Sequence, residues 1–222
     1  MGRSDQACPP LPYRPGVAAL RVYRVPFSTN VERVALALAH KGLAVEWVDV
    51  PAGDRREVEA VSGQPLVPVL VAGEEVVVDS PVILRLLEER FPAPPLWPDE
   101  PARRAEADVF VDWFNRVWKR PPNLIADEFA TDAPDQDAIA AWGRELTGSL
   151  DLFEGLLSRR HYLLGEQLGI ADVIAFPFLK YRSLWTEGDP DPFHAVLRDH
   201  LDGGAYARLD NWIARIDELP RA

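Results

Sequence analysis

The sequence predicts an α/β domain with the element order βαβαββα, followed by an all-α helical-bundle domain. Up to residue 91, short segments with alternating or helical apolar spacing succeed one another. After residue 100, apolar residues recur almost only at intervals of three or four. The proline-rich segment from Phe91 to Pro98 interrupts both patterns. We therefore expect a flexible tail over residues 1–19, an α/β domain over 20–91, a linker over 92–100 and a helical domain over 101–222.

The first half of the α/β domain is predicted to hold two strands and two helices. Leu20 to Val25 forms a short strand, and a turn leads from it into a helix with one apolar face that ends at Gly42. Ala44 to Val50 alternates as a half-buried strand does, and Asp54 to Val61 fits a short, irregular helix.

The second half of this domain is predicted to be a hairpin followed by a helix. Val67 to Val71 and Glu75 to Val78 are strands, and the three residues between them permit only an antiparallel connection. The next helix is expected to begin with Ser80 as N-cap and Pro81 as its first residue. Its buried face is expected to contain Val82, Ile83, Leu86 and Leu87.

The second domain reads as helical in three stretches. Glu106 to Trp118, Ile139 to Leu157 and Leu209 to Ile216 carry apolar residues at helical spacing. The segment from Pro121 to Asp137, rich in Pro, Asp and Ala, is predicted to be a loop. Gly169 is placed to cap a further helix, with Asp172 at the third position reaching back to the cap N–H, a structural role.

Composition limits the function. The 222 residues include 24 basic and 35 acidic side chains, a net charge of −11, which argues against a nucleic-acid-binding surface built on Lys and Arg. The single cysteine, Cys8, excludes an intrachain disulfide and suits a reducing compartment. No segment has the apolar length of a signal peptide or a membrane span. We therefore expect a cytoplasmic protein without membrane or nucleic-acid partners.

Two short segments suit the binding of a small peptide. Ser80 at a helix N-terminus could bind a carboxylate, and Asp79 beside it could hold an ammonium, although most such serines are plain caps. If the bond between Val67 and Pro68 is cis, the Val67 backbone is free to pair with an extended peptide; a trans proline at a strand start is the simpler reading.

Together these features resemble a cytosolic glutathione transferase of the serine-using, theta- or phi-like kind. The order of elements is that of a thioredoxin-like domain, and the run from Ser28 to Val34 (STNVERV) resembles the Ser-Thr and Arg-Val pattern of such enzymes. The resemblance implies glutathione as co-substrate and a homodimer. It also implies roles for Ser28 as thiol activator, Val67 with Pro68 as the backbone clamp on the cysteinyl unit, and Asp79 with Ser80 as the γ-glutamyl site.

The chemistry of Ser28 fits this resemblance. A hydroxyl that donates a hydrogen bond to sulfur stabilises the thiolate, which then attacks an electrophilic carbon. Ser28 could equally be an ordinary N-cap of the first helix, and Thr29 and Asn30 are alternative donors.

One departure concerns the glycyl carboxylate of glutathione. Family members often have a long polar residue before Val-Pro, where this chain has Pro65 and Leu66. Either Gln64, Lys41 or Arg56 takes over the contact, or glutathione binds weakly, or another molecule binds.

The second substrate is expected to be a small hydrophobic electrophile bound between the domains. Aromatic or apolar candidates for this pocket, which could equally be ordinary core, are Trp113, Phe114, Val117, Trp118, Tyr181 and Trp185. No histidine has metal-ligand spacing, so no metal is expected.

The leading hypothesis is a detoxification enzyme that conjugates glutathione to the electrophile, or uses the same thiolate for peroxide reduction, isomerisation or dehalogenation. The alternatives are a non-catalytic module of this fold that binds a ligand or protein, and a subunit of a larger complex.

Overall fold

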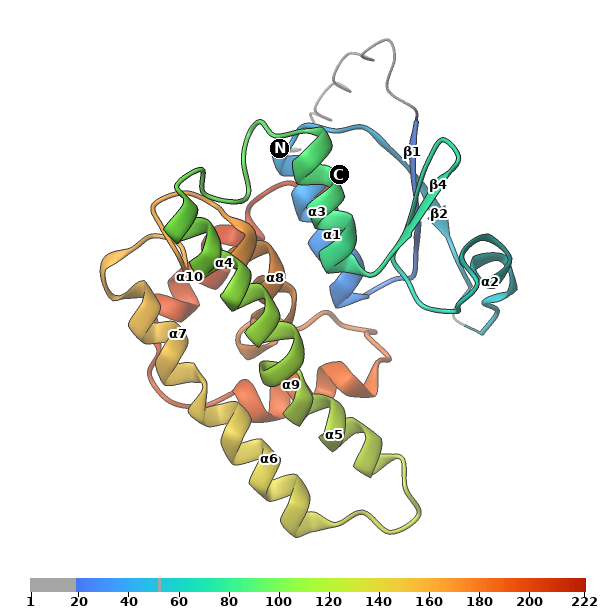
Figure 1. The fold of residues 1–222 in the computed structure, drawn as a ribbon. Helices are drawn as coiled ribbons and strands as arrows, with labels where there is room; N and C mark the ends of the chain where they lie inside the picture. Colours follow the sequence, from blue (N-terminus) through green and yellow to red (C-terminus); the bar gives the residue numbers. More distant parts are fainter. Residues whose placement is uncertain (1–18, 52) are drawn as a thin grey trace, which may run out of the picture.

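The computed structural model describes residues 19–51 and 53–222, so the expected tail, apart from residue 19, and Cys8 lie outside the described residues. Its first domain is a four-stranded sheet with the strand order β2-β1-β3-β4 and three helices (Figure 1). β1 pairs in parallel with β2 and antiparallel with β3, and β3 pairs antiparallel with β4. The elements are β1 (Leu20–Arg24), α1 (Thr29–His40), β2 (Val45–Asp49), α2 (Arg56–Ser62), β3 (Val69–Ala72), β4 (Glu75–Val78) and α3 (Ser80–Arg90).

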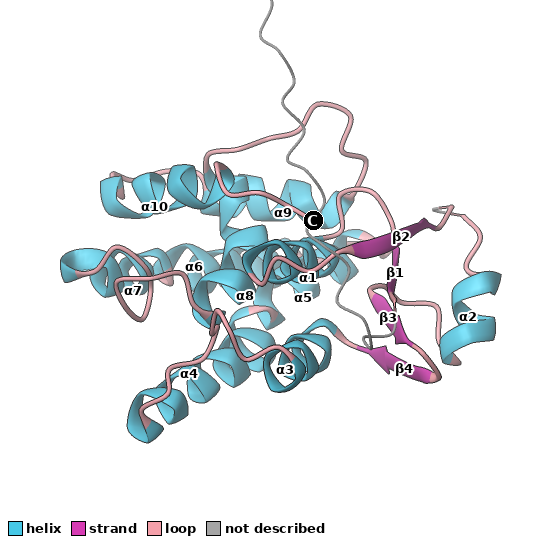
Figure 2. Cartoon of the chain, turned by 90° about the horizontal axis from the view of Figure 1, so that it is seen from above, coloured by secondary structure: helices cyan, strands magenta, loops and turns pink. Residues whose placement is uncertain are grey.

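The sheet separates two layers of helices. α1 and α3 lie on the face toward the second domain, and α2 lies on the opposite side (Figures 1 and 2). The alternation along β1 explains this arrangement, because Leu20 and Val22 join the main core whereas Tyr23 packs with Val58 of α2 in a smaller cluster. The predicted βαβαββα order is therefore confirmed.

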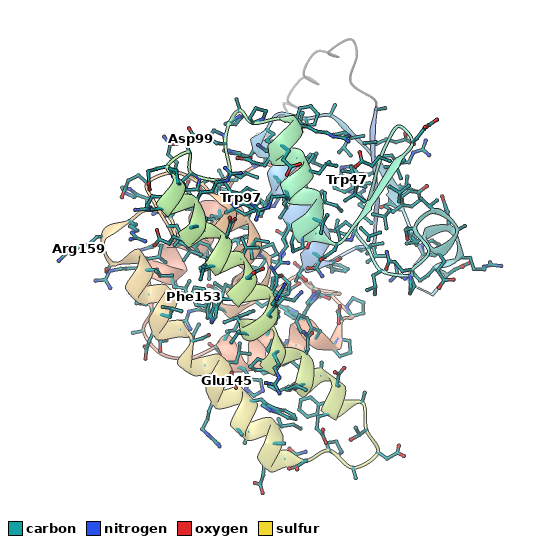
Figure 3. All side chains as sticks on the ribbon, viewed as in Figure 1. Trp47, Trp97, Asp99, Glu145, Phe153 and Arg159 are labelled. Carbon is teal, nitrogen blue, oxygen red and sulfur yellow. The ribbon has the colours of Figure 1, made fainter. Side chains whose placement is uncertain are left out.

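The second domain is helical. It consists of α4 (Pro101–Trp113), the π-helix η1 (Phe114–Trp118), α5 (Arg120–Phe129), α6 (Gln136–Gly148), α7 (Leu150–Leu156), the short 3₁₀-helix η2 (Leu157–Arg159), α8 (Ile170–Leu179), the short 3₁₀-helix η3 (Lys180–Arg182), α9 (Pro192–Leu201) and α10 (Ala207–Asp217). Every residue of α8 is buried, which makes it the centre of the domain. Phe153 of α7 packs in the same core against Phe114 and Trp118 (Figure 3). None of the described helices is long and apolar enough to cross a membrane.

The two domains share one hydrophobic core. A single cluster of buried residues extends from Leu20 and Val22 of β1, through α1 and α8, to Ile216 of α10. Arg33 of α1 crosses the same boundary, because its Nε donates to the carbonyl of Ile174 in α8 at 2.9 Å. The domains therefore form one packed body, and residues from both can be held in fixed relation at a shared site.

The start of α3 differs from the prediction. Asp79, not Ser80, is the N-cap, and Ser80 is the first helical residue with a fully enclosed side chain. The buried face of α3 also differs from the predicted one, since Leu84 is buried and Val82 is exposed. The chain enters the helix one residue earlier because Asp79 adopts a positive φ of 71°, a conformation that no spacing rule predicts.

The segment from Pro121 to Asp137 is not the loop that its composition predicted. α5 occupies residues 120–129, and Pro121 and Pro122 stand in its first turn, where a missing N–H costs nothing. Ile125 packs in a small buried cluster with Ile139 and Val196. Tertiary packing of this one apolar face outweighs the proline content.

The expected interaction between Gly169 and Asp172 at the start of α8 is present. The Asp172 carboxylate accepts hydrogen bonds from the N–H of Gly169 at 2.9 Å, the N–H of Leu163 at 2.9 Å and the indole of Trp212 at 2.7 Å. Position 169 favours glycine for a structural reason, because an added Cβ would lie 3.3 Å from the Leu96 carbonyl oxygen. That carbonyl instead accepts the N–H of Ile170 at 2.8 Å and so caps the helix in place of a serine or threonine.

Candidate active site

A cavity of about 410 Å³ lies between the two domains and has the size of a small-molecule site. The first domain contributes the loop before α1, the loop before α2 and the loop before β3. The second domain contributes η1, α5, α8 and α9 or the residues next to them. The lining residues are Val25, Pro26, Ser28, Thr29, Asn30, Arg55, Pro65, Leu66, Val67, Lys119, Asn123, Phe178, Asp191, Phe193 and His194.

Ser28 lies in this cavity as the N-cap of α1. Its Oγ accepts a long hydrogen bond of 3.4 Å from the N–H of Val31, which leaves the hydroxyl proton free to be donated. The capping role and the role of a donor to an anion are therefore compatible, because one uses the oxygen and the other uses the hydrogen. The positive end of α1 also favours negative charge at this point.

The loop before β3 forms another part of the wall. The bond between Val67 and Pro68 is cis, and Val67 lines the cavity. Pairing of β3 with β1 begins only at Val69, so the Val67 backbone is outside the ladder of the sheet. Gln64 does not line the cavity: its side chain donates to the Leu66 carbonyl at 2.9 Å and accepts the Leu66 N–H at 2.6 Å.

A network around Arg33 joins the starts of α1 and α3. Arg33 Nη1 donates to Asn30 Oδ1 at 3.1 Å, Ser80 Oγ at 3.2 Å and Asn115 Oδ1 at 2.9 Å. Burial lowers the pKa of Arg33 to about 9, and the negative charge of Asp79 opposes this shift. The enclosed Ser80 hydroxyl is thus held by Arg33, whereas the exposed Asp79 carboxylate makes no capping bond within α3.

Asn30 is drawn into the same network. Besides Arg33 and Ser80, its Oδ1 lies 3.5 Å from Lys119 Nζ. These contacts make Asn30 a junction between the domains through its acceptor Oδ1, while its amide N–H groups remain an alternative donor to Ser28. Thr29 lines the cavity with a buried side chain and remains an alternative to Ser28.

Two cations at the cavity were not among the sequence candidates. Arg55 precedes α2, and its Nη1 is buried with no hydrogen-bond partner among the described residues. Lys119 follows η1, and its Nζ lies 4.8 Å from the centre of the Phe178 ring. Burial, and then the charge of Arg33, lowers the pKa of Lys119 to about 7.

The other cationic candidates lie elsewhere. Lys41 Nζ is buried against Glu88 at 2.7 Å and the Pro94 carbonyl at 3.0 Å, and Arg56 is exposed and paired with Asp54 at 2.5 Å. Neither lines the cavity.

The aromatic wall is also different from the candidates that spacing suggested. Phe114, Trp118 and Tyr181 are core residues, and Trp113 packs against Phe110 and Phe114. Val117 and Trp185 are exposed. The rings that line the cavity are Phe178 and Phe193. His194 lines it too, and its Nδ1 lies 2.8 Å from Asp189 Oδ2. Only the folding of α8 against α1, and of α9 against α8, brings these residues together, so no local sequence signal identified them.

The fold and the cavity define a class of protein, a thioredoxin-like domain with a packed helical domain and a small-molecule site at their junction. Residues 22–95 match the family model described as "Glutathione S-transferase, N-terminal domain". Residues 136–215 match "Glutathione S-transferase, C-terminal domain". The chain belongs to the glutathione S-transferase family.

Individual relatives agree with these matches. The chain is 30% identical over 169 residues to glutathione S-transferase 3 of Zea mays, which covers 70% of this chain and 75% of the maize protein. It is 29% identical over 161 residues to glutathione S-transferase GstB of Escherichia coli K12, which covers 68% of this chain and 77% of that protein. A crystal structure of a glutathione S-transferase from Rhodospirillum rubrum superposes with a TM-score of 0.67 at 27% identity, covering 90% of this chain and 88% of the other.

Proposed function

We propose that this protein is a serine-type glutathione transferase in which Ser28 activates the thiol of glutathione and the thiolate attacks a small electrophile. The observation that carries the proposal is the position of Ser28, at the N-terminus of α1 and in a cavity shared with Val67. The new bond joins sulfur to the electrophilic carbon, and either a leaving group departs or the product gains a proton from solvent.

The energetics suit this role. A free thiol has a pKa near 8.5, and lowering it by about 2 units requires roughly 2.7 kcal/mol of preferential stabilisation of the thiolate. A hydrogen bond to a charged group contributes about 1.5 to 3 kcal/mol. The N-terminus of α1 adds about 0.3 to 1 kcal/mol, so Ser28 and the helix together can supply the shift.

The remaining contacts to glutathione are assigned from the family resemblance, with Asp79 and Ser80 at the start of α3, outside the cavity lining. The backbone of Val67, set by the bond to Pro68, pairs with the cysteinyl unit, and the Asp79 carboxylate holds the γ-glutamyl ammonium. Backbone N–H groups at the start of α3 donate to the γ-glutamyl carboxylate, because the Ser80 hydroxyl is already engaged with Arg33 and Asn30. Gln64 was a candidate for the glycyl carboxylate, but its amide is engaged by Leu66, so we assign that contact to Arg55.

Replacing Arg55 with methionine tests this last assignment. We expect the KM for glutathione to rise about tenfold or more, because one charge-assisted contact is lost. The kcat at saturating glutathione should stay within about twofold, since the reacting sulfur is untouched. Arg56→Met is the matched control, because it removes an exposed arginine that does not line the cavity. Equal effects of the two substitutions would show that Arg55 does not contact glutathione.

The test of the function itself is direct. The purified protein is mixed with glutathione and 1-chloro-2,4-dinitrobenzene, and the conjugate is followed by absorbance across glutathione concentrations. Saturable turnover supports the proposal. Absence of both turnover and saturable glutathione binding at millimolar concentration would make the chain a binding module of this fold.

Assembly and location belong to the same proposal. We assign the chain as a cytoplasmic homodimer with a role in detoxification. Exposed valines on β4, α3 and α4, namely Val76, Val78, Val82 and Val109, support an apolar contact between copies. Light scattering after gel filtration measures the mass, and a species of 24.8 kDa would contradict the dimer.

A further inference from the structure

The chain contains three lysines, and their environments differ. Lys41 pairs with Glu88 at 2.7 Å, and Lys180 pairs with Glu32 at 2.6 Å. Lys119 has no carboxylate within ion-pair distance among the described residues, and the only acceptor near its Nζ is Asn30 Oδ1 at 3.5 Å. A half-buried lysine at the cavity is thus left without an anionic partner among the described residues.

The charges around Lys119 do not compensate for its own. Arg33 and Arg55 add positive charge beside and across the cavity. Asp191 is the acidic residue in the lining, and its Oδ1 accepts the N–H of Phe193 at 3.0 Å as the N-cap of α9, while its Oδ2 lies 3.8 Å from His194 Nε2. Asp79 raises the pKa of Lys119, but its effect is smaller than the opposing effects of burial and of Arg33. A protein of net charge −11 therefore concentrates unpaired positive charge at this cavity.

The position of Lys119 helps to decide which of two anionic ligands it contacts, glutathione or the second substrate. Arg55 lines the cavity from the thioredoxin-like domain, as does Val67, whose backbone is proposed to pair with the peptide. Lys119 lies on the helical domain, over the ring of Phe178 and in the same wall as Phe193. A ligand with an apolar body against these rings and an anionic group on Lys119 fits this wall. The contacts assigned to glutathione belong to the thioredoxin-like domain, which leaves this wall of the helical domain for the second substrate.

We propose that Lys119 binds a carboxylate of the second substrate, so that the preferred electrophiles are small organic acids with an aromatic or unsaturated body. This inference rests on the proposed function, and it replaces a purely hydrophobic electrophile with an anionic one. A bound carboxylate supplies the partner that the ammonium lacks and offsets the desolvation of the lysine. Lys119 thereby sets specificity, and Ser28 acts on sulfur.

The test compares two electrophiles that differ in one charge, 4-chloro-3-nitrobenzoate and 4-chloro-3-nitrobenzamide. In both reactions the thiolate forms a bond to the ring carbon, chloride leaves with the bonding pair, and the thiol proton passes to solvent. Each rate is divided by the uncatalysed rate with glutathione, which removes the difference in intrinsic reactivity. The variants are Lys119→Met, Lys119→Arg as the conservative replacement, and Arg116→Met. Arg116 is an exposed cation of η1 outside the cavity lining and serves as the matched control for the loss of one charge.

We expect the wild type to favour the benzoate. Lys119→Met should lower kcat/KM for the benzoate by about tenfold to a hundredfold and change that for the benzamide by less than about threefold, with an unchanged Kd for glutathione. Lys119→Arg should retain most of the preference, and Arg116→Met all of it. A melting temperature for each variant excludes unfolding as the cause.

Other outcomes would contradict either the inference about Lys119 alone or the proposed function together with it. Turnover of the benzamide without an advantage for the benzoate, or an equal loss for both in Lys119→Met, would refute the inference alone. Weaker glutathione binding by Lys119→Met would place Lys119 on glutathione and refute it as well. If the wild type turns over neither compound and does not bind glutathione, the proposed function fails, and the inference fails with it.

Discussion

Replacing Ser28 with alanine is expected to lower kcat by about tenfold to a hundredfold while leaving glutathione affinity within about threefold. The hydroxyl proton is free because the Oγ serves as acceptor for the N–H of Val31. Its removal takes away the donor to the thiolate but none of the contacts assigned to the peptide. The pKa of bound glutathione, measured from the ultraviolet absorbance of the thiolate across pH, should rise toward the value of about 8.5 for a free thiol.

Two control variants sharpen this result. Ser28→Thr keeps a hydroxyl and should retain activity if a donor at this position is what matters. Thr29→Val removes the alternative hydroxyl, which lines the same cavity, and should leave the thiol pKa unchanged. If the thiol pKa of bound glutathione stays at its wild-type value in Ser28→Ala but rises in Thr29→Val, then Thr29 and not Ser28 is the donor to the thiolate.

Replacing Asp172 with alanine is expected to cause the largest loss of stability among single substitutions at the start of α8. Its buried carboxylate accepts hydrogen bonds from Leu163, Gly169 and Trp212, so removal leaves three donors unpaired. At about 1 to 3 kcal/mol for each unsatisfied group, the free energy of unfolding should fall by about 3 kcal/mol or more. The expected drop in Tm is about 6 to 12 °C for a chain of this length.

Asp172→Asn is the matched variant for this prediction. An amide oxygen can still accept from Leu163 and Trp212, but the amide nitrogen cannot accept the Gly169 N–H, so the loss should be smaller. Thermal unfolding followed by circular dichroism measures both variants. An alanine variant within about 1 kcal/mol of wild type would show that water replaces the carboxylate and that this network does not hold the domain together.

Much of the fold was accessible from the sequence. Alternation and helical spacing predicted the order βαβαββα, because those periods record which side of each element is buried. The local pattern of Gly169 and Asp172 predicted the interaction at the start of α8, since a helix start places these residues next to each other. α5 escaped prediction because its two prolines and two acidic residues equal its apolar residues in number, and its stability comes from packing against α6 and α9.

The features of the site also fall into those that the sequence predicted and those that only the fold decided. The sequence by itself determined the short-range features, namely a serine at the start of α1, a Val-Pro before β3 and an acidic residue followed by serine before α3, because each depends on a few consecutive residues. Only the tertiary structure decided which cations face the cavity. Arg55 and Lys119 lie 64 positions apart, and Lys119 meets Asn30 across 89 positions. Nothing in the local spacing distinguishes Lys119 from Lys180. Only packing of the helical domain against α1 pairs Lys180 with Glu32 and leaves Lys119 at the cavity without a counter-ion in the described part of the chain.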